Sequence, residues 1–411
     1  MKVCFVTANY PPEACGGTEQ VVVALARELA VYGAKVSAIS GTDAPHILED
    51  TREEQHDDIA VTRVFRKSDE RDQDGFERPR VLQAIRQKLT QLKPDIVHVH
   101  SFAGLSLGIS KICNDLSIPV VVTFHDMWMT CARYFRLPAP GVVCPTGSDH
   151  SACVPCVHDT VEMDVAVLTQ ALEHRDALMR AEIACASACT SPSQTAASLV
   201  RDCLPFAGDI EVIPHGLLRE VSIDEAAVSR TARKRLRIGT FGGLVESKGI
   251  RELVQACVEL IAAGYDCELH LSGPWHQEDL AAEIRDLAHL GGLDLIERGR
   301  FASADRHPAR DLDLAVFPSK CQETYGLVVD EALAHRVPVV VSNFGALAER
   351  SATPGVVVAS LDALAEVLKE LISSPEMLAS LRNTIPEQMP TIKVSAKRHL
   401  AIYQTLIGAP R

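Results

Sequence analysis

The chain has 411 residues, of which 47% are hydrophobic and 23% are charged, and its formal net charge is −13. A chain of this length exceeds one ordinary hydrophobic core, so we expect two domains of about 200 residues each. The acidic balance excludes broad binding to nucleic acid, because attraction to phosphates requires a basic face.

The sequence contains no stretch that approaches the ~18 continuous apolar residues of a membrane-spanning helix. Asn9 and the Pro11-Pro12 pair interrupt the first apolar run before it could serve as a signal peptide. We therefore expect a cytoplasmic protein.

Predicted strands and helices alternate along nearly the whole chain, which is the pattern of parallel α/β domains. In the first half the predicted strands are 3–8, 35–40, 60–64, 96–100, 120–124, 186–191 and 210–213. In the second half they are 236–240, 267–271, 293–296, 312–317, 337–341 and 355–358. The economical architecture is two Rossmann-like, doubly wound domains, 1–215 and 216–392, which face each other across a cleft at the carboxyl ends of their strands.

The first strand leads into Gly16-Gly17, which precede an amphipathic helix containing Val21, Leu25 and Leu29. Two glycines at a strand-to-helix junction permit a ligand to approach the N–H groups at the positive end of the helix. The spacing is not the Gly-x-Gly-x-x-Gly of dinucleotide enzymes, which argues against a nicotinamide oxidoreductase. A simple tight turn is the alternative interpretation.

Six basic residues occur in one segment of the first half, interleaved with acidic residues. They are Arg63, Arg66, Lys67, Arg71, Arg78 and Arg80. The mixed signs predict a solvated loop. The alternative is a membrane-facing acceptor site, with peripheral contact to the inner membrane surface.

Histidines occur on two predicted strands of the first half. His125 ends strand 120–124, at the position where open α/β sheets place ligand contacts. A structural histidine bonded to a neighbouring loop is the alternative. His98 and His100 alternate along strand 96–100, and we expect them to face opposite sides without a catalytic role.

Four of the thirteen cysteines fall in one stretch that is rich in proline and glycine. They are Cys131, Cys144, Cys153 and Cys156, and the last two form Cys-x-x-Cys. Four thiolates that close around zinc would order a loop that lacks a core of its own. A structural zinc site is one prediction; unliganded thiols or disulfides are the alternatives.

Two carboxylates lie eight positions apart in the second half. Glu323 precedes a predicted helix at 326–334, and Glu331 lies on it. Eight residues at helical rise span about 12 Å. Carboxylates that cleave a glycosidic bond stand about 5 to 9.5 Å apart, so two anchors on an extended ligand fit better than a hydrolase dyad. A surface helix that carries two acids by chance is the alternative.

The Glu323-x7-Glu331 pattern, with Tyr325-Gly326 inside it, resembles the signature of the retaining glycosyltransferases of family 4, which have the GT-B fold. The resemblance covers essentially the whole chain. In that family the first glutamate binds sugar hydroxyls and the second binds the ribose of a nucleotide-sugar. The C-terminal helix of the family, here 393–411, packs back on the first domain. Some members carry a similar four-cysteine insertion.

The segment from Gly242 to Lys248 resembles the family motif whose arginine and lysine neutralise the departing diphosphate. Lys248 is retained, whereas Gly243 stands where arginine is usual. A lone lysine before a helix is otherwise a common solvated residue. The donor-binding residues implied are Gly242, Gly243, Lys248, Glu323, Thr324, Tyr325, Gly326, Leu327 and Glu331.

The resemblance implies a catalytic set of His125, Lys248 and Glu323, with Gly16 and Gly17 at the acceptor. The implied reaction moves a hexose, with retention, from a nucleotide-diphosphate sugar to a glycan or lipid-linked acceptor. The donor phosphate accepts the proton, and catalysis requires no metal. Two alternatives remain: a sugar-nucleotide epimerase or phosphorylase of the same architecture, and a non-catalytic nucleotide-sugar sensor with a zinc loop.

Overall fold

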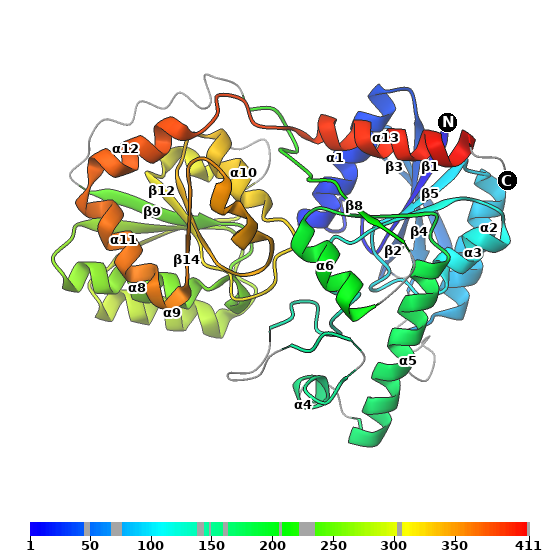
Figure 1. Cartoon of the computed structure of the whole chain (residues 1–411), viewed down its shortest axis with the longest axis horizontal. Coiled ribbons are helices and arrows are strands. Elements are labelled where there is room, and N and C mark those ends of the chain that lie inside the picture. Colours follow the sequence, from blue (N-terminus) through cyan, green and yellow to red (C-terminus); the bar gives the residue numbers. More distant parts are fainter. Residues whose placement is uncertain are drawn as a thin grey trace. The chain divides into compact units, whose positions relative to one another are not determined.

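The computed structural model describes residues 1–44, 50–66, 76–137, 144–147, 149–158, 163–204, 208–221, 235–301 and 306–408. They form two compact units (Figure 1). The first unit comprises Met1–Leu218 and a C-terminal segment that begins at Thr391, and the second comprises Arg219–Pro390. Each unit has its own sheet and its own hydrophobic core, which confirms the prediction of two α/β domains.

The first unit is built on an eight-stranded sheet with the order β3-β4-β2-β1-β5-β6-β7-β8. The strands are β1 (Lys2–Thr7), β2 (Lys35–Thr42), β3 (Thr51–His56), β4 (Ile59–Phe65), β5 (Ile96–Val99), β6 (Val120–Thr123), β7 (Ala188–Ser191) and β8 (Ile210–Val212). Strand β3 pairs antiparallel with β4, and the other neighbours pair in parallel. Strands β5 and β6 are buried along their whole length, as expected for a parallel sheet covered on both faces.

In the part of the first unit that the structure describes, six helices connect or flank these strands, and a seventh comes from the C-terminal segment. They are α1 (Gly17–Val31), α2 (Pro79–Leu92), α3 (Ile109–Asp115), α4 (Cys153–His158), α5 (Val165–Ala184), α6 (Gln194–Cys203) and α13 (Ile392–Gly408). Helix α13, red in Figure 1, packs against α1. The N–H of Ile392 donates to the carbonyl of Leu217 at 2.8 Å, so the two segments that leave and re-enter this unit lie side by side.

The second unit has a six-stranded parallel sheet with the order β11-β10-β9-β12-β13-β14. The strands are β9 (Leu236–Phe241), β10 (Cys267–Ser272), β11 (Asp294–Gly299), β12 (Leu314–Phe317), β13 (Val339–Ser342) and β14 (Val356–Ala359). The helices are α8 (Ile250–Ala262), α9 (Glu278–Leu290), α10 (Leu327–Ala334), α11 (Leu364–Ser373) and α12 (Pro375–Thr384). Short 3₁₀ turns occupy Glu246–Lys248, Pro308–Asp311, Gly345–Ala352 and Leu361–Ala363. None of the helices in the described part of the chain has the length and apolar character needed to cross a membrane.

The predicted solvated loop around the basic residues is wrong at three of its positions. The Arg63 side chain is fully buried, because β4 carries it into the unit, where its guanidinium donates to the carbonyls of Tyr10 and Pro11 at 2.8 and 2.7 Å. The residues Arg66 and Arg78 are also largely buried. Arg80 is half-exposed, in agreement with the prediction. Two further members, Lys67 and Arg71, lie outside the described residues.

Candidate functional site

Two residues from separate motifs meet in the second unit. The Lys248 ammonium donates a hydrogen bond to Oε1 of Glu323, and the Ser319 hydroxyl donates to the same oxygen at 2.8 Å. The Glu323 side chain is 17% exposed, whereas that of Lys248 is 39% exposed. The Glu323 carboxylate is therefore fixed by two hydrogen bonds, whereas the Lys248 ammonium remains accessible.

The charges of this pair stabilise each other. Burial alone would raise the pKa of Glu323, but the positive charge of Lys248 and the hydrogen bonds from Lys248 and Ser319 hold it below its usual value. Burial likewise opposes the ammonium form, yet Glu323 raises the pKa of Lys248. Both groups are therefore ionised at neutral pH.

Two glycines allow the backbone to approach closely enough for this pairing. Gly249 has φ = 71°, and a Cβ there would lie 1.9 Å from the carbonyl oxygen of Pro318. Gly345 has φ = 57°, and a Cβ there would lie 2.5 Å from the backbone nitrogen of Glu323. Only glycine adopts this conformation readily and leaves room for the neighbouring chain. The local sequence gives no signal for this role of Gly345.

A buried cluster fixes the start of α10. The Tyr325 hydroxyl donates to Asp330 at 2.6 Å, and the Arg350 guanidinium donates to Asp330 at 2.9 Å. The same guanidinium lies 4.6 Å from the centre of the Tyr325 ring. Asp330 and Arg350 could not be predicted as part of this cluster, because nothing in the local sequence pattern distinguishes them from surface charges. Gly326 is the N-cap at φ = 83° and makes no side-chain cap, and the first N–H groups of α10, as in any helix, have no partners inside the helix.

The other predicted donor-binding residues lie around this centre with different neighbours. Glu331, on α10, is 30% exposed, and its Oε2 lies 3.7 Å from Nε2 of His307. Thr324 and Leu327 are half-buried beside Glu323 and at the first position of α10. Gly242 and Gly243 follow β9, and both are half-buried.

The surroundings of Gly243 show whether a side chain could be present at this position. Its backbone lies outside the left-handed region, and the nearest atom to a Cβ would be Nε2 of His276 at 3.5 Å. That is ordinary van der Waals contact, so a Cβ is accommodated here without a clash. The backbone conformation at this position therefore does not require glycine in place of the family's arginine.

The first unit contains a polar cavity of about 500 Å³. Its lining comes from the carboxyl ends of several strands and from the start of α1. The lining residues are Thr7, Ala8, Asn9, Thr18, Glu19, Asp43, Arg66, Arg78, Ser101, Ala103, Gly104, Asp126 and Tyr134. Ligands of open α/β sheets bind at this edge. The predicted residues Gly16 and Gly17 are exposed and adjoin Thr18, but they are not part of the lining.

Arg66 is held rigidly at the wall of this cavity. It donates to both Asp43 oxygens at 3.2 and 2.8 Å, and to the carbonyls of Ala8 and Gly104 at 3.1 and 3.3 Å. Its Nη2, which also donates to Asp43, donates to Oδ1 of Asn9 at 3.3 Å. The guanidinium thus joins three loops at the carboxyl edge of the sheet and shapes the cavity.

His125 follows β6 and is buried in a cluster of histidines. Its Nε2 lies 2.9 Å from Nδ1 of His100, and its ring stacks on that of His215 at 5.1 Å. His98 bonds Thr123 at 2.7 Å and the Tyr403 hydroxyl at 2.5 Å, which links the cluster to α13. The neighbouring residue Asp126, rather than His125, lines the cavity.

The prediction that His98 and His100 face opposite sides is wrong. Their ring centres are 3.9 Å apart, because residues two positions apart on a strand point to the same face. Burial lowers the pKa of His125 to about 3, with a smaller contribution from the charge of His399. Burial also lowers the pKa of His98 and of His100 well below the usual value. At neutral pH the cluster is therefore uncharged.

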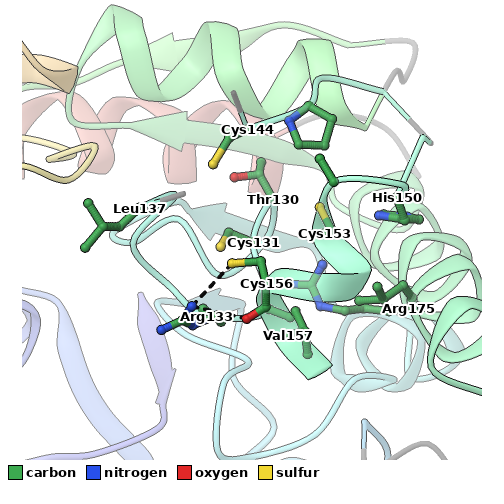
Figure 2. Close-up of a pocket in the computed structure, with 14 residues that line it drawn as sticks. Thr130, Cys131, Arg133, Leu137, Cys144, His150, Cys153, Cys156, Val157 and Arg175 are labelled. Carbon is green, nitrogen blue, oxygen red and sulfur yellow. Dashed lines mark hydrogen bonds between the residues drawn. The ribbon is translucent and has the colours of Figure 1, made fainter. Parts of the chain in front are cut away.

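The four cysteines predicted as zinc ligands line a single cavity in the first unit (Figure 2). Among the described residues, no three His, Cys, Asp or Glu side chains are arranged so that they could hold a metal ion. All thirteen cysteines are free thiols in the structure.

Two family models match the chain, one in each unit. Residues 15–218 match the model of Glycosyltransferase Family 4, and residues 235–374 match that of Glycosyl transferases group 1. D-inositol 3-phosphate glycosyltransferase 1 of Catenulispora acidiphila is 33% identical over 189 residues. That match covers 42% of the chain and 44% of the length of the relative.

Solved structures share the fold over the full length. HepE of Anabaena, in complex with UDP and glucose, is 16% identical with a TM-score of 0.68, and the match covers 98% of this chain and 100% of HepE. The catalytic domain of starch synthase IV from Arabidopsis thaliana, bound to ADP and acarbose, is 15% identical with a TM-score of 0.66, with 99% of each chain covered. At these identities the likeness establishes the fold. With both family models matched, the chain belongs to the family 4 glycosyltransferases, which have the GT-B fold.

Proposed function

We propose that the chain transfers a hexose, with retention of configuration, from a nucleotide-diphosphate sugar to a glycan or lipid-linked acceptor. The observation that carries the proposal is the pairing of Lys248 with Glu323. A sugar diphosphate needs acceptors for its hydroxyl groups and a cation for its phosphates. Glu323 supplies the acceptors and Lys248 supplies the cation. The two residues are joined by one hydrogen bond and lie before the N-terminus of α10.

The leaving diphosphate is assigned to Lys248 and to the first N–H groups of α10. These amides have no partners within the helix and carry the positive end of its dipole, which favours an anion. Gly326, at the N-cap of this helix, makes no side-chain hydrogen bond to them. In this proposal cations and amides, rather than a metal, stabilise the charge that develops on the departing phosphate.

Glu323 binds sugar hydroxyls in this proposal, and Glu331 binds the ribose. Lys248 and Ser319 keep the Glu323 carboxylate ionised, so that it accepts hydrogen bonds and donates none. The exposure of Glu331 leaves it accessible to a ligand. The donor phosphate takes the proton of the acceptor, on the face from which the leaving group departs. His125, which is neutral at neutral pH, acts as a hydrogen-bonding group beside the transferred sugar.

The acceptor is assigned to the polar cavity of the first unit and to the adjoining Gly16-Gly17 turn. The cavity presents carboxylates, hydroxyls and guanidinium groups, which suit a ligand rich in hydroxyl groups. The Catenulispora relative is named for an inositol phosphate acceptor, which supports this class. We place the protein in the cytoplasm, with contact to the inner membrane surface when the acceptor is lipid-linked.

The nucleotide base of the donor can be identified by experiment. HepE is solved with UDP, and the starch synthase is solved with ADP. A thermal-shift screen with uridine, guanosine and adenosine diphosphate sugars identifies the donor, because a ligand that binds the folded state raises Tm. Incubation with that donor and an acceptor, followed by NMR of the anomeric proton of the product, tests the transfer and its stereochemistry.

The outcomes separate the alternatives. A product with the anomeric configuration of the donor supports the proposal, and an inverted product contradicts it. Saturable donor binding without turnover in the presence of acceptors would indicate a sensor. Conversion of the donor to its epimer, or phosphate-dependent cleavage, would indicate an epimerase or a phosphorylase.

A further inference from the structure

A small cavity of about 40 Å³ in the first unit is lined by Cys131, Cys144, Cys153 and Cys156. These residues come from three separate segments, and the last two lie on the short helix α4. Figure 2 shows the four cysteine side chains around one cavity, with the guanidinium groups of Arg133 and Arg175 beside them. Nothing in the proposed transfer reaction uses this place.

The stretch that carries these thiols has very little core of its own. Its apolar cluster contains three buried residues, Val154, Leu168 and Leu172. A core this small contributes little stability, and natural domains with small cores add a metal or disulfides. The thiols are therefore placed where a cross-link would stabilise the stretch most.

Arg175 gives an independent indication of what fills the cavity. Its side chain is 3% exposed, and its Nε and Nη2 have no hydrogen-bond partner within the described part of the chain. The guanidinium lies over the Trp128 ring at 5.0 Å, and Asp176 is 3.9 Å away while it also bonds His150 at 2.9 Å. A buried cation with so little compensation is costly unless an anionic group faces it.

A second cation lies against the thiols themselves. Arg133 donates to the sulfur of Cys156 at 3.3 Å and to its carbonyl at 3.1 Å. Four neutral thiols, or two disulfides, would bring no negative charge to face these guanidinium groups. Four thiolates around Zn²⁺ carry a net charge of −2, which matches the two cations. Hydrogen bonds from guanidinium groups to ligating sulfurs also hold such ligands in place.

We propose that Cys131, Cys144, Cys153 and Cys156 bind one structural zinc ion, with Arg175 and Arg133 as the cations that neutralise the site. In the described residues the side chains are not yet arranged as ligands, so binding turns the thiols inward and releases their protons. The bound zinc ion would cross-link α4 to the segment that begins at Cys131. It does not depend on the proposed transfer reaction.

Zinc content of the whole protein, purified without chelator, is measured by inductively coupled plasma mass spectrometry. We expect about one zinc ion per chain. Cys131→Ser and Cys156→Ser reduce the content to below about one tenth. Cys185→Ser is the matched control, because Cys185 is a half-buried free thiol outside the cavity, and it keeps the zinc.

Cobalt replacement tests the site without a cysteine variant. Native protein stripped of metal and titrated with Co²⁺ develops sulfur-to-cobalt charge-transfer bands and the visible absorption of a tetrahedral site. Arg175→Met keeps the bulk of the side chain and removes its charge. We expect the equilibrium for zinc transfer to a chelator to be at least about tenfold more favourable for this variant than for the native protein. The proposal is overturned if the native protein contains almost no zinc and mass spectrometry finds the four cysteines either alkylated as free thiols or joined in disulfides.

Discussion

Lys248 and Glu323 lie 75 positions apart in the sequence, yet the ammonium of one donates a hydrogen bond to the carboxylate of the other. One residue follows β9 and the other follows β12, which are neighbours in the sheet. Adjacent parallel strands bring their carboxyl ends to the same edge, so the two motifs meet there. This meeting creates the charged centre on which the proposed donor site depends.

Gly243→Arg is expected to increase donor use. The fold leaves room at this position, and an arginine there would add a charge-assisted hydrogen bond to the leaving diphosphate. One such bond is worth about 1.5 kcal/mol or more, which corresponds to a rise of about tenfold in kcat/KM for the donor. Gly243→Met provides the bulk without the charge. Equal activity of the two variants would contradict a role for a cation at this position.

The cluster at the start of α10 is expected to stabilise the second unit. Arg350→Ala leaves the buried Asp330 carboxylate without its cation, which should lower the free energy of unfolding by about 3 kcal/mol. Tyr325→Phe removes one hydrogen bond and should cost about 1 kcal/mol. Arg285→Ala, which breaks an exposed pair with Glu297, should leave the free energy of unfolding almost unchanged. Urea unfolding measures all three, and equal losses would refute the assignment.

The histidine cluster should make the first unit sensitive to acid. Burial lowers the pKa of His125 to about 3 and of His399 to about 4, and it places His98 and His100 well below their usual value. Their contribution to stability is complete above the unfolded pKa of about 6.5 and is lost as the pH falls toward the folded values. Each fully buried imidazole costs about 1.4 kcal/mol per pH unit in that window.

Tm measured between pH 7.5 and pH 5 checks this dependence. The exposed His289 on α9 provides a control, because His289→Gln should leave the slope unchanged. A Tm that stays constant across this range would show that the cluster is protonated or solvated in the folded protein.

Asp126→Asn is expected to weaken acceptor binding selectively. Asp126 lines the polar cavity and accepts a hydrogen bond from the Trp128 N–H at 2.8 Å, which asparagine can also accept. The loss of the carboxylate should raise KM for the acceptor about tenfold, since hydrogen bonds to charged groups contribute about 1.5 kcal/mol or more. KM for the donor should not change. Asp115→Asn, on the exposed surface of α3, is the control; a rise in donor KM alone would contradict the assignment.

The parallel strands could be predicted because each is a short, largely apolar run bounded by turn residues. Strand β3 was missed, because its sequence, Thr51–His56, is polar and pairs at the edge of the sheet, where half of its residues face solvent. Burial of Arg63 was also missed. Its partners include Glu54 on the neighbouring strand and the carbonyls of Tyr10 and Pro11, and contacts with such distant segments leave no mark in the local sequence.

Candidate site residues could be predicted from the sequence only where one motif carries its own signal, and their roles stay predictions. The glycine-rich segment before Lys248 and the paired glutamates are local patterns. The cluster of Asp330 with Arg350, and the contact of Gly345 with Glu323, arise from tertiary packing of separate segments. The histidine error has a different origin: the period of a strand places His98 and His100 on one face, and the side-chain alternation was misapplied.

The central claim is tested most directly by donor turnover in three purified variants. Lys248→Ala removes the cation and Glu323→Ala removes the carboxylate, whereas Lys369→Ala removes an exposed lysine of α11 that pairs with Glu366. With Tm close to that of the native protein, the first two should each lower kcat by at least about a hundredfold, and the third should remain active. Near-native kcat in either Lys248→Ala or Glu323→Ala would contradict the account.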